Sequence, residues 1–192
     1  MAVRSLLKTI LAVTTLCLSL NASANLIFDF EENLSDRSHQ IIYNLSGIVL
    51  TVTAFDDSDR NPNKNINRSV SGLGVNGNPE SGQIGNNEYL VFTFDEIFYG
   101  HFNITFGNWS VNRNNPKRTD VAGIALNGGV STSFSAGNGP FTSDYAAIKT
   151  FTVMGAGGSF KVANVELVPE PSALAILGLG LLGLGARRFK KS

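Results

Sequence analysis

Between its two ends, the chain is a series of short runs of β-branched and aromatic residues, separated by clusters of glycine and asparagine. The clearest run is Ile48–Phe55, and Phe102–Phe106 also alternates between apolar and polar side chains. A period of two places one face of a strand against a core. No helical pattern of ten residues occurs outside the two ends. The sequence therefore predicts an all-β body, folded as a single antiparallel, jelly-roll-like β-sandwich.

The expected strands are bounded by turn-forming clusters such as Asn76-Gly77-Asn78-Pro79 and Gly137-Asn138-Gly139-Pro140. Phenylalanine and aliphatic side chains supply the expected core. The pattern does not give the order of the strands in the sheets. We predict strands at Leu26–Phe30, Gln40–Tyr43, Gly47–Phe55, Tyr89–Phe94, Phe98–Phe106, Val121–Leu126, Ile148–Val153 and Ser159–Leu167.

The charges are unevenly distributed along the chain. Residues 25–168 carry nine basic and fourteen acidic side chains, a net charge of −5, although the whole chain is formally neutral. An acidic body argues against a nucleic-acid partner, which needs clustered lysine and arginine. The only cysteine is Cys17, so the body is expected to lack disulfides and cysteine-based zinc sites.

Residues 1–24 have the three parts of a secretory signal peptide. A basic start precedes the apolar stretch Ile10–Leu20, and Ala22 and Ala24 provide the small residues that signal peptidase needs. Cleavage after Ala24 leaves Asn25 as the first residue. The alternative is a membrane anchor, but the apolar stretch is shorter than the roughly 20 residues that span a bilayer.

The C-terminus also has three parts. Pro169-Glu170-Pro171 interrupts regular structure and is followed by the apolar stretch Ala173–Ala186. As a helix, that stretch is about 21 Å long, shorter than the roughly 30 Å hydrocarbon core. The chain then ends in a basic cluster that is expected to stay in the cytoplasm. The tail therefore predicts a hydrophobic helix that holds an exported chain in the inner membrane for a time.

These three parts, in this order at the end of a chain with a signal peptide, resemble a PEP-CTERM sorting signal. Pro169, Glu170 and Pro171 match the motif, and Arg187 and Arg188 match its basic end. The resemblance implies a Gram-negative host in which an exosortase-like membrane enzyme cuts near the motif and passes the protein to the cell surface or the exopolysaccharide matrix. The alternative is a permanent single-pass anchor.

The body also resembles many PEP-CTERM ectodomains over roughly residues 40–110. In that family a Gly-Leu-Gly-Val loop, here Gly72–Val75, precedes a strand of the type found at Glu88–Phe94. This resemblance implies a β-sandwich and adds nothing about chemistry.

One acidic loop has calcium-like spacing. Asp57, Asp59 and Asn61 place oxygen atoms at every second position, as at the start of an EF-hand loop. The match then fails, because Pro62 replaces the glycine and Arg68 stands where a bidentate glutamate is needed. We expect a solvated acidic loop and no cofactor. The alternative is a loop that binds Ca²⁺.

Two further residues are candidates for contact with sugars. Trp109 has asparagine neighbours and is either a glycan-stacking residue or part of the core. Asn33 follows Glu31-Glu32 in a pattern resembling the bacterial N-glycosylation sequon, although Asn-x-Ser/Thr matches arise by chance in a chain rich in asparagine.

No catalytic set is found in the sequence. The chain lacks a Gly-x-Ser-x-Gly elbow, and neither His39 nor His101 has a histidine or cysteine at ligand spacing. Adjacent residues on a strand face opposite sides, so Asp95 and Glu96 are not expected to form a glycosidase pair. We expect them to cap a strand end.

The sequence thus predicts three segments: a signal peptide at 1–24, a sandwich at 25–167 and a sorting segment at 168–192. The expected function is that of a non-enzymatic surface or matrix protein. Its expected partners are signal peptidase, an exosortase-like enzyme, the membrane before processing, and exopolysaccharide. A carbohydrate-binding module and a secreted hydrolase on a jelly-roll scaffold are the alternatives.

Overall fold

The structure, a computed structural model, describes residues 25–32, 38–57, 64–76, 82–109, 119–143 and 146–169. These residues contain strands and no helix, so the all-β prediction is confirmed. The strands belong to the unit Asn25–Val168. They are β1 (Leu26–Asp29), β2 (Gln40–Leu45), β3 (Ile48–Asp56), β4 (Asn65–Ser69), β5 (Gly72–Asn76), β6 (Glu88–Gly107), β7 (Val121–Leu126), β8 (Thr132–Ser135), β9 (Phe141–Thr142), β10 (Ala146–Gly157) and β11 (Lys161–Pro169).

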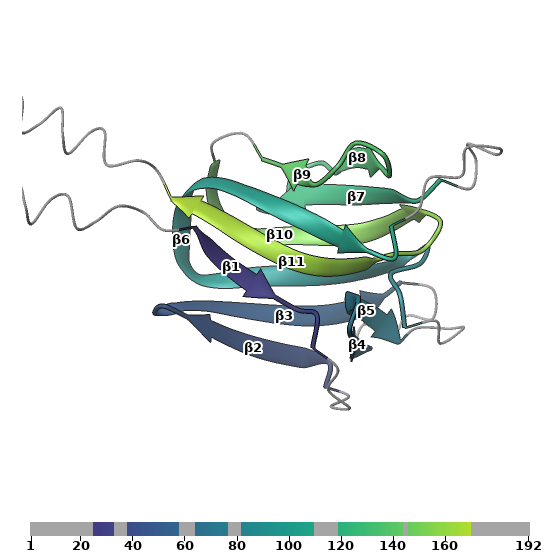
Figure 1. Cartoon of the computed structure of the whole chain (residues 1–192), viewed down its shortest axis with the longest axis horizontal. Helices are drawn as coiled ribbons and strands as arrows, with labels where there is room; N and C mark the ends of the chain where they lie inside the picture. The colour runs from purple at the N-terminus through teal and green to yellow at the C-terminus, as the bar shows by residue number, and fades with distance from the viewer. Residues whose placement is uncertain are drawn as a thin grey trace, which may run out of the picture. The chain divides into compact units, whose positions relative to one another are not determined.

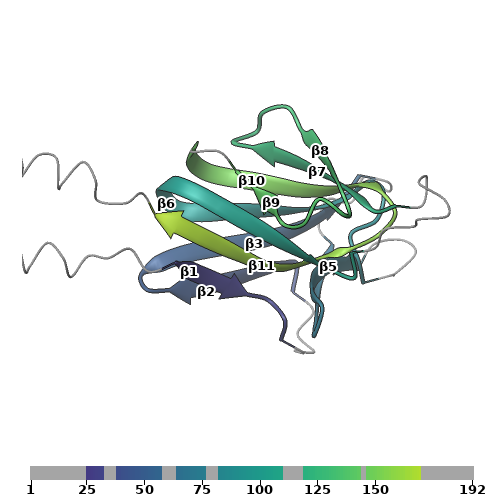
Figure 2. The ribbon, with the colours of Figure 1, turned by 45° about the horizontal axis from the view of Figure 1, so that its top comes forward.

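The 20-residue strand β6 joins the two layers of the sandwich. Its first half pairs with β3 and β10 in a back layer that continues to β2, β7 and β8. Its second half folds over to lie beside β11, which pairs with β1 and β5 in the front layer (Figures 1 and 2). All of these pairings between strands are antiparallel.

The bend in β6 lies at Asp95–Ile97. These three consecutive residues are exposed, whereas the rest of the strand alternates between buried and less buried positions. The pairing with β10 also shifts there, from Thr93 opposite Thr150 to Phe98 opposite Ile148. Such a bulge bends a strand and lets it pass from one layer to the next.

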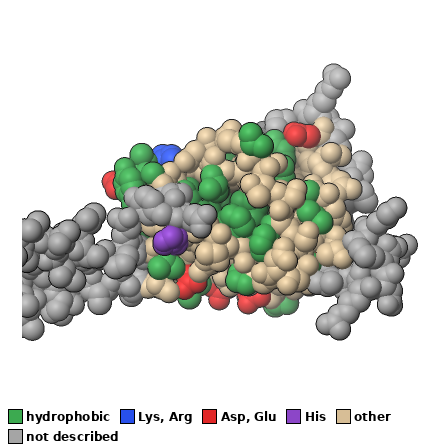
Figure 3. Space-filling view, turned by 90° about the horizontal axis from the view of Figure 1, so that it is seen from above, with side chains coloured by type: hydrophobic (Ala, Val, Ile, Leu, Met, Phe, Trp, Pro, Cys, Tyr) green, Lys and Arg blue, Asp and Glu red, His purple; other side chains and the backbone are tan. Residues whose placement is uncertain are grey.

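The core between the layers is built largely from phenylalanine rings. Phe92 and Phe151 of the back layer stack with ring centroids 4.5 Å apart. Phe30 and Phe102 of the front layer reach this pair at 6.0 and 5.1 Å respectively. All four rings are at most 1% exposed, and full burial of each is worth about 1.5–3 kcal/mol. Seen from above, hydrophobic side chains show at several places on the surface, and acidic side chains lie near its margins (Figure 3).

The expected strands are found, most of them with limits shifted by one to four residues. The runs Tyr89–Phe94 and Phe98–Phe106 form the one strand β6, because the bulge at Asp95–Ile97 bends the strand without ending it. Four short strands, β4, β5, β8 and β9, lack a clear alternating pattern and were not expected.

The prediction that Gly72–Val75 is a loop is wrong. These residues form most of β5 and are buried. A side chain at Gly72 would strike the backbone of Val162, so glycine is what lets β11 approach this closely. The glycines therefore serve close packing of strands, and the loop reading mistook them for turn residues.

Both ends of the chain lie mostly outside the described residues. The signal peptide at 1–24 and the C-terminal hydrophobic helix therefore stay predictions. Within the described part of the chain, no helix is long and apolar enough to cross a membrane.

Candidate functional site

The strands β1 and β11 bring the two ends of the sandwich side by side. Leu26 is paired with Leu167, so the start of β1 lies against the end of β11 (Figure 1). The Asn25 side-chain amide donates to Glu166 Oε1 at 2.6 Å, and that of Asn103 donates to Glu166 Oε2 at 2.8 Å. Asn25, the expected N-terminus of the mature protein, is thereby held beside the end of β11.

The strand β11 leads into the Pro-Glu-Pro segment without an intervening loop. Leu167 is fully buried, and β11 ends at Pro169. Gly100 of β6 has φ +148°, and a Cβ there would strike the carbonyl oxygen of Val168. The backbone of β11 is thus packed closely against β6 up to the last residue before the segment.

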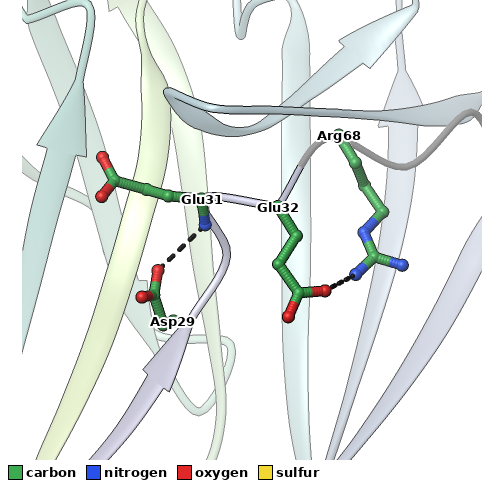
Figure 4. A network of polar contacts seen from close by, with 4 residues as sticks. All are labelled: Asp29, Glu31, Glu32 and Arg68. Atoms are coloured by element: carbon green, nitrogen blue, oxygen red, sulfur yellow. Dashed lines mark hydrogen bonds and ion pairs between the residues drawn. The ribbon is translucent and has the colours of Figure 1, made fainter.

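A charged contact ties the segment after β1 to β4. Arg68 Nη2 donates to Glu32 Oε2 at 3.0 Å (Figure 4). The Arg68 guanidinium also lies 5.6 Å from the centre of the Tyr43 ring. Burial raises the pKa of Tyr43 to about 12; Arg68 lowers it and Glu32 raises it to a smaller extent. Arg68 is 10% exposed and Glu32 65%, so one partner is held in the fold and the other in solvent. We interpret the contact as structural.

Lys161 is a buried cation at the start of β11. It is 6% exposed, and its Nζ donates to Asn67 Oδ1 at 2.8 Å and to Ser69 Oγ at 2.6 Å, both on β4. Burial lowers the pKa of Lys161. The side chain crosses β5 beside Gly72 and Gly74, which are paired with Ser69 and Asn67 and present no side chain. Sequence reasoning missed this residue, although a lone lysine between Phe160 and Val162 was visible.

The structure describes only part of the expected calcium loop. Asp57 accepts a hydrogen bond from the Tyr89 hydroxyl at 3.2 Å, while Asp59 and Asn61 lie outside the described residues. Within those residues, no three or more histidine, cysteine or acidic side chains are arranged to hold a metal ion. Calcium at Asp57, Asp59 and Asn61 stays a prediction.

Trp109 is packed against the aromatic end of the core. Its ring stacks on Phe106 at 4.4 Å and meets the edge of Phe160 at 4.9 Å. Its Nε1 is buried without a hydrogen-bond partner in the described part of the chain. This packing favours the core role over glycan stacking, which stays a prediction. Asn33, the glycosylation candidate, lies outside the described residues.

Asp95 organises the bend of β6. Its carboxylate accepts from the Val49 backbone N–H at 3.1 Å, and its backbone carbonyl accepts from Lys149 Nζ. The Asp95 side chain thus takes the place of a backbone partner for Val49 where the pairing of β3 with β6 ends, as a capping residue does. Both Asp95 and Glu96 are exposed at the bulge, and the expectation that they do not form a glycosidase pair stays a prediction.

The sorting residues sit at the limit of the described chain. Pro169 ends β11, whereas Glu170, Pro171, Arg187 and Arg188 lie outside the described residues. The cleavage residues Ala22 and Ala24 also lie outside them. The structure therefore gives the point from which the tail leaves the sandwich, and not the tail itself.

Comparison with known proteins identifies the tail. Residues 167–190 match the family model of the PEP-CTERM protein-sorting motif. The motif indicates export and sorting to the cell surface in Gram-negative bacteria. No curated protein matches the chain.

One solved structure with similarity to the chain comes from work titled "The complexity of the Ruminococcus flavefaciens cellulosome reflects an expansion in glycan recognition". The match covers 77% of this chain and 95% of that chain, with 14% sequence identity and a TM-score of 0.34. A similarity at this level supports neither a common ligand nor a common activity.

Proposed function

Because the chain carries a PEP-CTERM protein-sorting motif at residues 167–190, we propose that it is a non-enzymatic protein of the cell surface or extracellular matrix. Signal peptidase releases its N-terminus, and an exosortase-like enzyme processes its tail. The mature sandwich then associates with exopolysaccharide. The sorting motif is the observation that carries this proposal.

The packing of the described charged groups supports a non-enzymatic body. Lys161 is bound to Asn67 and Ser69, and Arg68 to Glu32, in contacts that join neighbouring strands. Asp95 replaces a missing backbone partner of β3. Each of these groups has a structural task, which is the use expected of charges in a scaffold.

The position of the motif supports processing next to the folded domain. The matched region begins at Leu167, which is buried within β11. A protease binds its substrate as an extended chain, and residues held in an interior strand are not accessible for that. We therefore place the cut after β11, at or beyond Pro169-Glu170-Pro171.

The tail supplies the membrane step of the proposal. The apolar stretch Ala173–Ala186 holds the exported chain in the inner membrane, and the basic end with Arg187 and Arg188 stays in the cytoplasm. Removal of this stretch releases the sandwich toward the surface. Both steps use the tail alone and require no change in the sandwich.

Replacement of Pro169-Glu170-Pro171 by three alanines tests the proposal in the native host. The variant is expected to keep its tail and to accumulate in the inner membrane, while the unaltered protein reaches the surface or the medium. A Pro79→Ala/Glu80→Ala variant, which alters the other Pro-Glu pair of the chain, is the control and should be processed normally. Normal release of the triple-alanine variant would contradict the proposal.

A further inference from the structure

The outer face of the back layer carries threonines on three neighbouring strands. They are Thr51 and Thr53 on β3, Thr93 on β6, and Thr150 and Thr152 on β10, and we call this surface the threonine face. Their neighbours along the strands are buried in the core: Leu50, Val52, Phe92, Phe94, Phe151 and Val153. Because side chains alternate along a strand, the five threonines point away from the core.

The pairing of the strands aligns these threonines in rows. Thr51 is opposite Thr93, which is opposite Thr150, and Ile42 of β2 extends the row. In the second row Thr53 is opposite Val91, which is opposite Thr152. Neighbours within a row are about 4.8 Å apart and the rows about 6.8 Å apart, as the spacing of strands and residues dictates.

The five threonines are partly buried, and most of their hydroxyls have no hydrogen-bond partner among the described residues. Thr53 Oγ1 accepts a weak hydrogen bond from Gln40 at 3.4 Å. The hydroxyls of Thr51, Thr93, Thr150 and Thr152 make no side-chain hydrogen bond within the part of the chain that the structure describes. Each threonine also offers a methyl group, so the face mixes apolar and hydrogen-bonding contacts at short intervals.

An aromatic pair lies in the next row. Phe55 is opposite Tyr89, and their rings stack with centroids 5.1 Å apart and 12° between planes. Tyr89 is in turn opposite Met154 of β10. The Tyr89 hydroxyl is fixed by its bond to Asp57, which holds the ring in place. The rows of threonines thus end in a platform of apolar side chains.

The described residues in the rows of the threonine face are uncharged. Charged residues occur at its two ends: Asp57 lies beside Tyr89, and at the other end Asp95 lies beside Val49 and accepts from Lys149, the exposed residue that precedes Thr150. The net charge of −5 on residues 25–168 also disfavours acidic polymers as partners.

We propose that the threonine face binds a neutral polysaccharide chain, an inference that rests on the proposed association with exopolysaccharide and names its site. Sugar rings present apolar C–H faces and hydroxyl edges, which match methyl groups, an aromatic pair and free hydroxyls. The partner contributes no charge, in agreement with the uncharged face. A second copy of the chain fits less well, because it would set unpaired threonine hydroxyls against one another in place of the apolar centre typical of dimers.

Binding to insoluble glucans tests this proposal. The exported protein, recovered from its host, is incubated with microcrystalline cellulose and with an insoluble β-1,3-glucan, and with alginate beads as the acidic polymer. We expect retention on at least one neutral glucan and none on alginate. Thr93→Lys places a charge in the middle of the face and should weaken retention at least tenfold. Thr142→Lys, at the exposed residue of β9 outside this face, is the matched control and should bind normally.

The outcomes separate this inference from the proposed sorting. Thr93→Val keeps the shape and removes only the hydroxyl, so it should weaken retention even if the lysine variant folds poorly. No retention on either glucan, equal loss in Thr93→Lys and Thr142→Lys, or a dimer in sedimentation that Thr93→Lys dissociates would each overturn the proposal. Tail processing, read from the mass of the same preparation, is unaffected by any of these results.

Discussion

Leu26 and Leu167 are opposite each other across β1 and β11, so the first and last strands of the sandwich are neighbours. In sequence they are nearly the whole length of the domain apart. Pairings over such a distance form late in folding, because the intervening chain must first be ordered. The sandwich is therefore completed only once the residues directly before the sorting segment have been exported.

Truncation of Leu167 should measure how firmly this strand is held. Leu167 is fully buried, so Leu167→Ala is expected to lower the free energy of unfolding by about 2–4 kcal/mol. Val168, its neighbour, is only partly buried, and Val168→Ala should cost less than about 1.5 kcal/mol. Denaturant unfolding of both variants gives the comparison. Equal losses would show that the end of β11 is not packed as described.

The raised pKa of Tyr43 predicts that the folded chain loses stability at high pH. Burial raises its pKa in the folded chain to about 12, compared with an ordinary value of 10.0. Between these two values the folded chain holds a proton that the unfolded chain has lost, so stability falls as the pH rises. At 1.36 kcal/mol per pKa unit the fall is at most about 2–3 kcal/mol, and solvent screening of this partly exposed ring reduces it to about 1–2 kcal/mol.

Tyr43→Phe tests this prediction. The variant should lose much of the decrease in stability between pH 10 and pH 12. At pH 7 it should be at least as stable as the parent, because the Tyr43 hydroxyl is buried without a partner in the described residues. Tyr99→Phe, at a tyrosine that is 54% exposed, is the control. Stability that stays flat above pH 10 in the parent protein would refute the burial of Tyr43.

Substitution by alanine should change the stability of the protein differently at two glycines of β10. At Gly155 an added Cβ would strike the backbone of Gly85, whereas at Gly157 it would lie at an ordinary 3.6 Å from Val121 Cβ. Gly155→Ala is expected to cost at least about 2 kcal/mol, since backbone atoms cannot easily move aside. Gly157→Ala should change stability by less than about 1 kcal/mol. Thermal unfolding distinguishes them, and the reverse order would contradict the packing of β10.

Substitutions at Trp109 distinguish a role in the core from a role in glycan binding. Because its ring packs on Phe106 and Phe160, Trp109→Ala should lower the free energy of unfolding by about 2–4 kcal/mol. Trp109→Phe should recover part of that loss and leave glucan retention unchanged. Loss of retention in Trp109→Phe, with stability preserved, would support the glycan-stacking role instead.

Two kinds of run were sufficient to predict the main strands: the alternating run Ile48–Phe55, which has one buried face, and the apolar run Val121–Leu126, which is buried on both faces. Ile48–Phe55 and Val121–Leu126 are strands close to their expected limits. Gly72–Val75 was wrongly predicted as a loop, because glycine is common both in turns and where strands pack closely. The close approach of Val162 to Gly72, which shows the second case, is not visible in the sequence. The bend at Asp95–Ile97 was likewise read as a gap between strands.

The polar contacts were less predictable than the strands. Lys161 reaches Asn67 and Ser69 on a strand more than 90 residues away in sequence, and no local pattern indicates that contact. The rows of the threonine face depend on the pairing of β3, β6 and β10. The sorting motif was predictable, because its three parts are contiguous and do not depend on the fold.

The intact mass of the protein recovered from the envelope and the medium of its native host tests the central claim most directly. Export with tail processing predicts a species that starts at Asn25 and ends at or shortly after Pro169-Glu170-Pro171, without Arg187 and Arg188. Any mass beyond that peptide would indicate glycosylation or a transferred anchor. A species running from Asn25 to Ser192 would mean a permanent anchor and would contradict processing at the sorting motif.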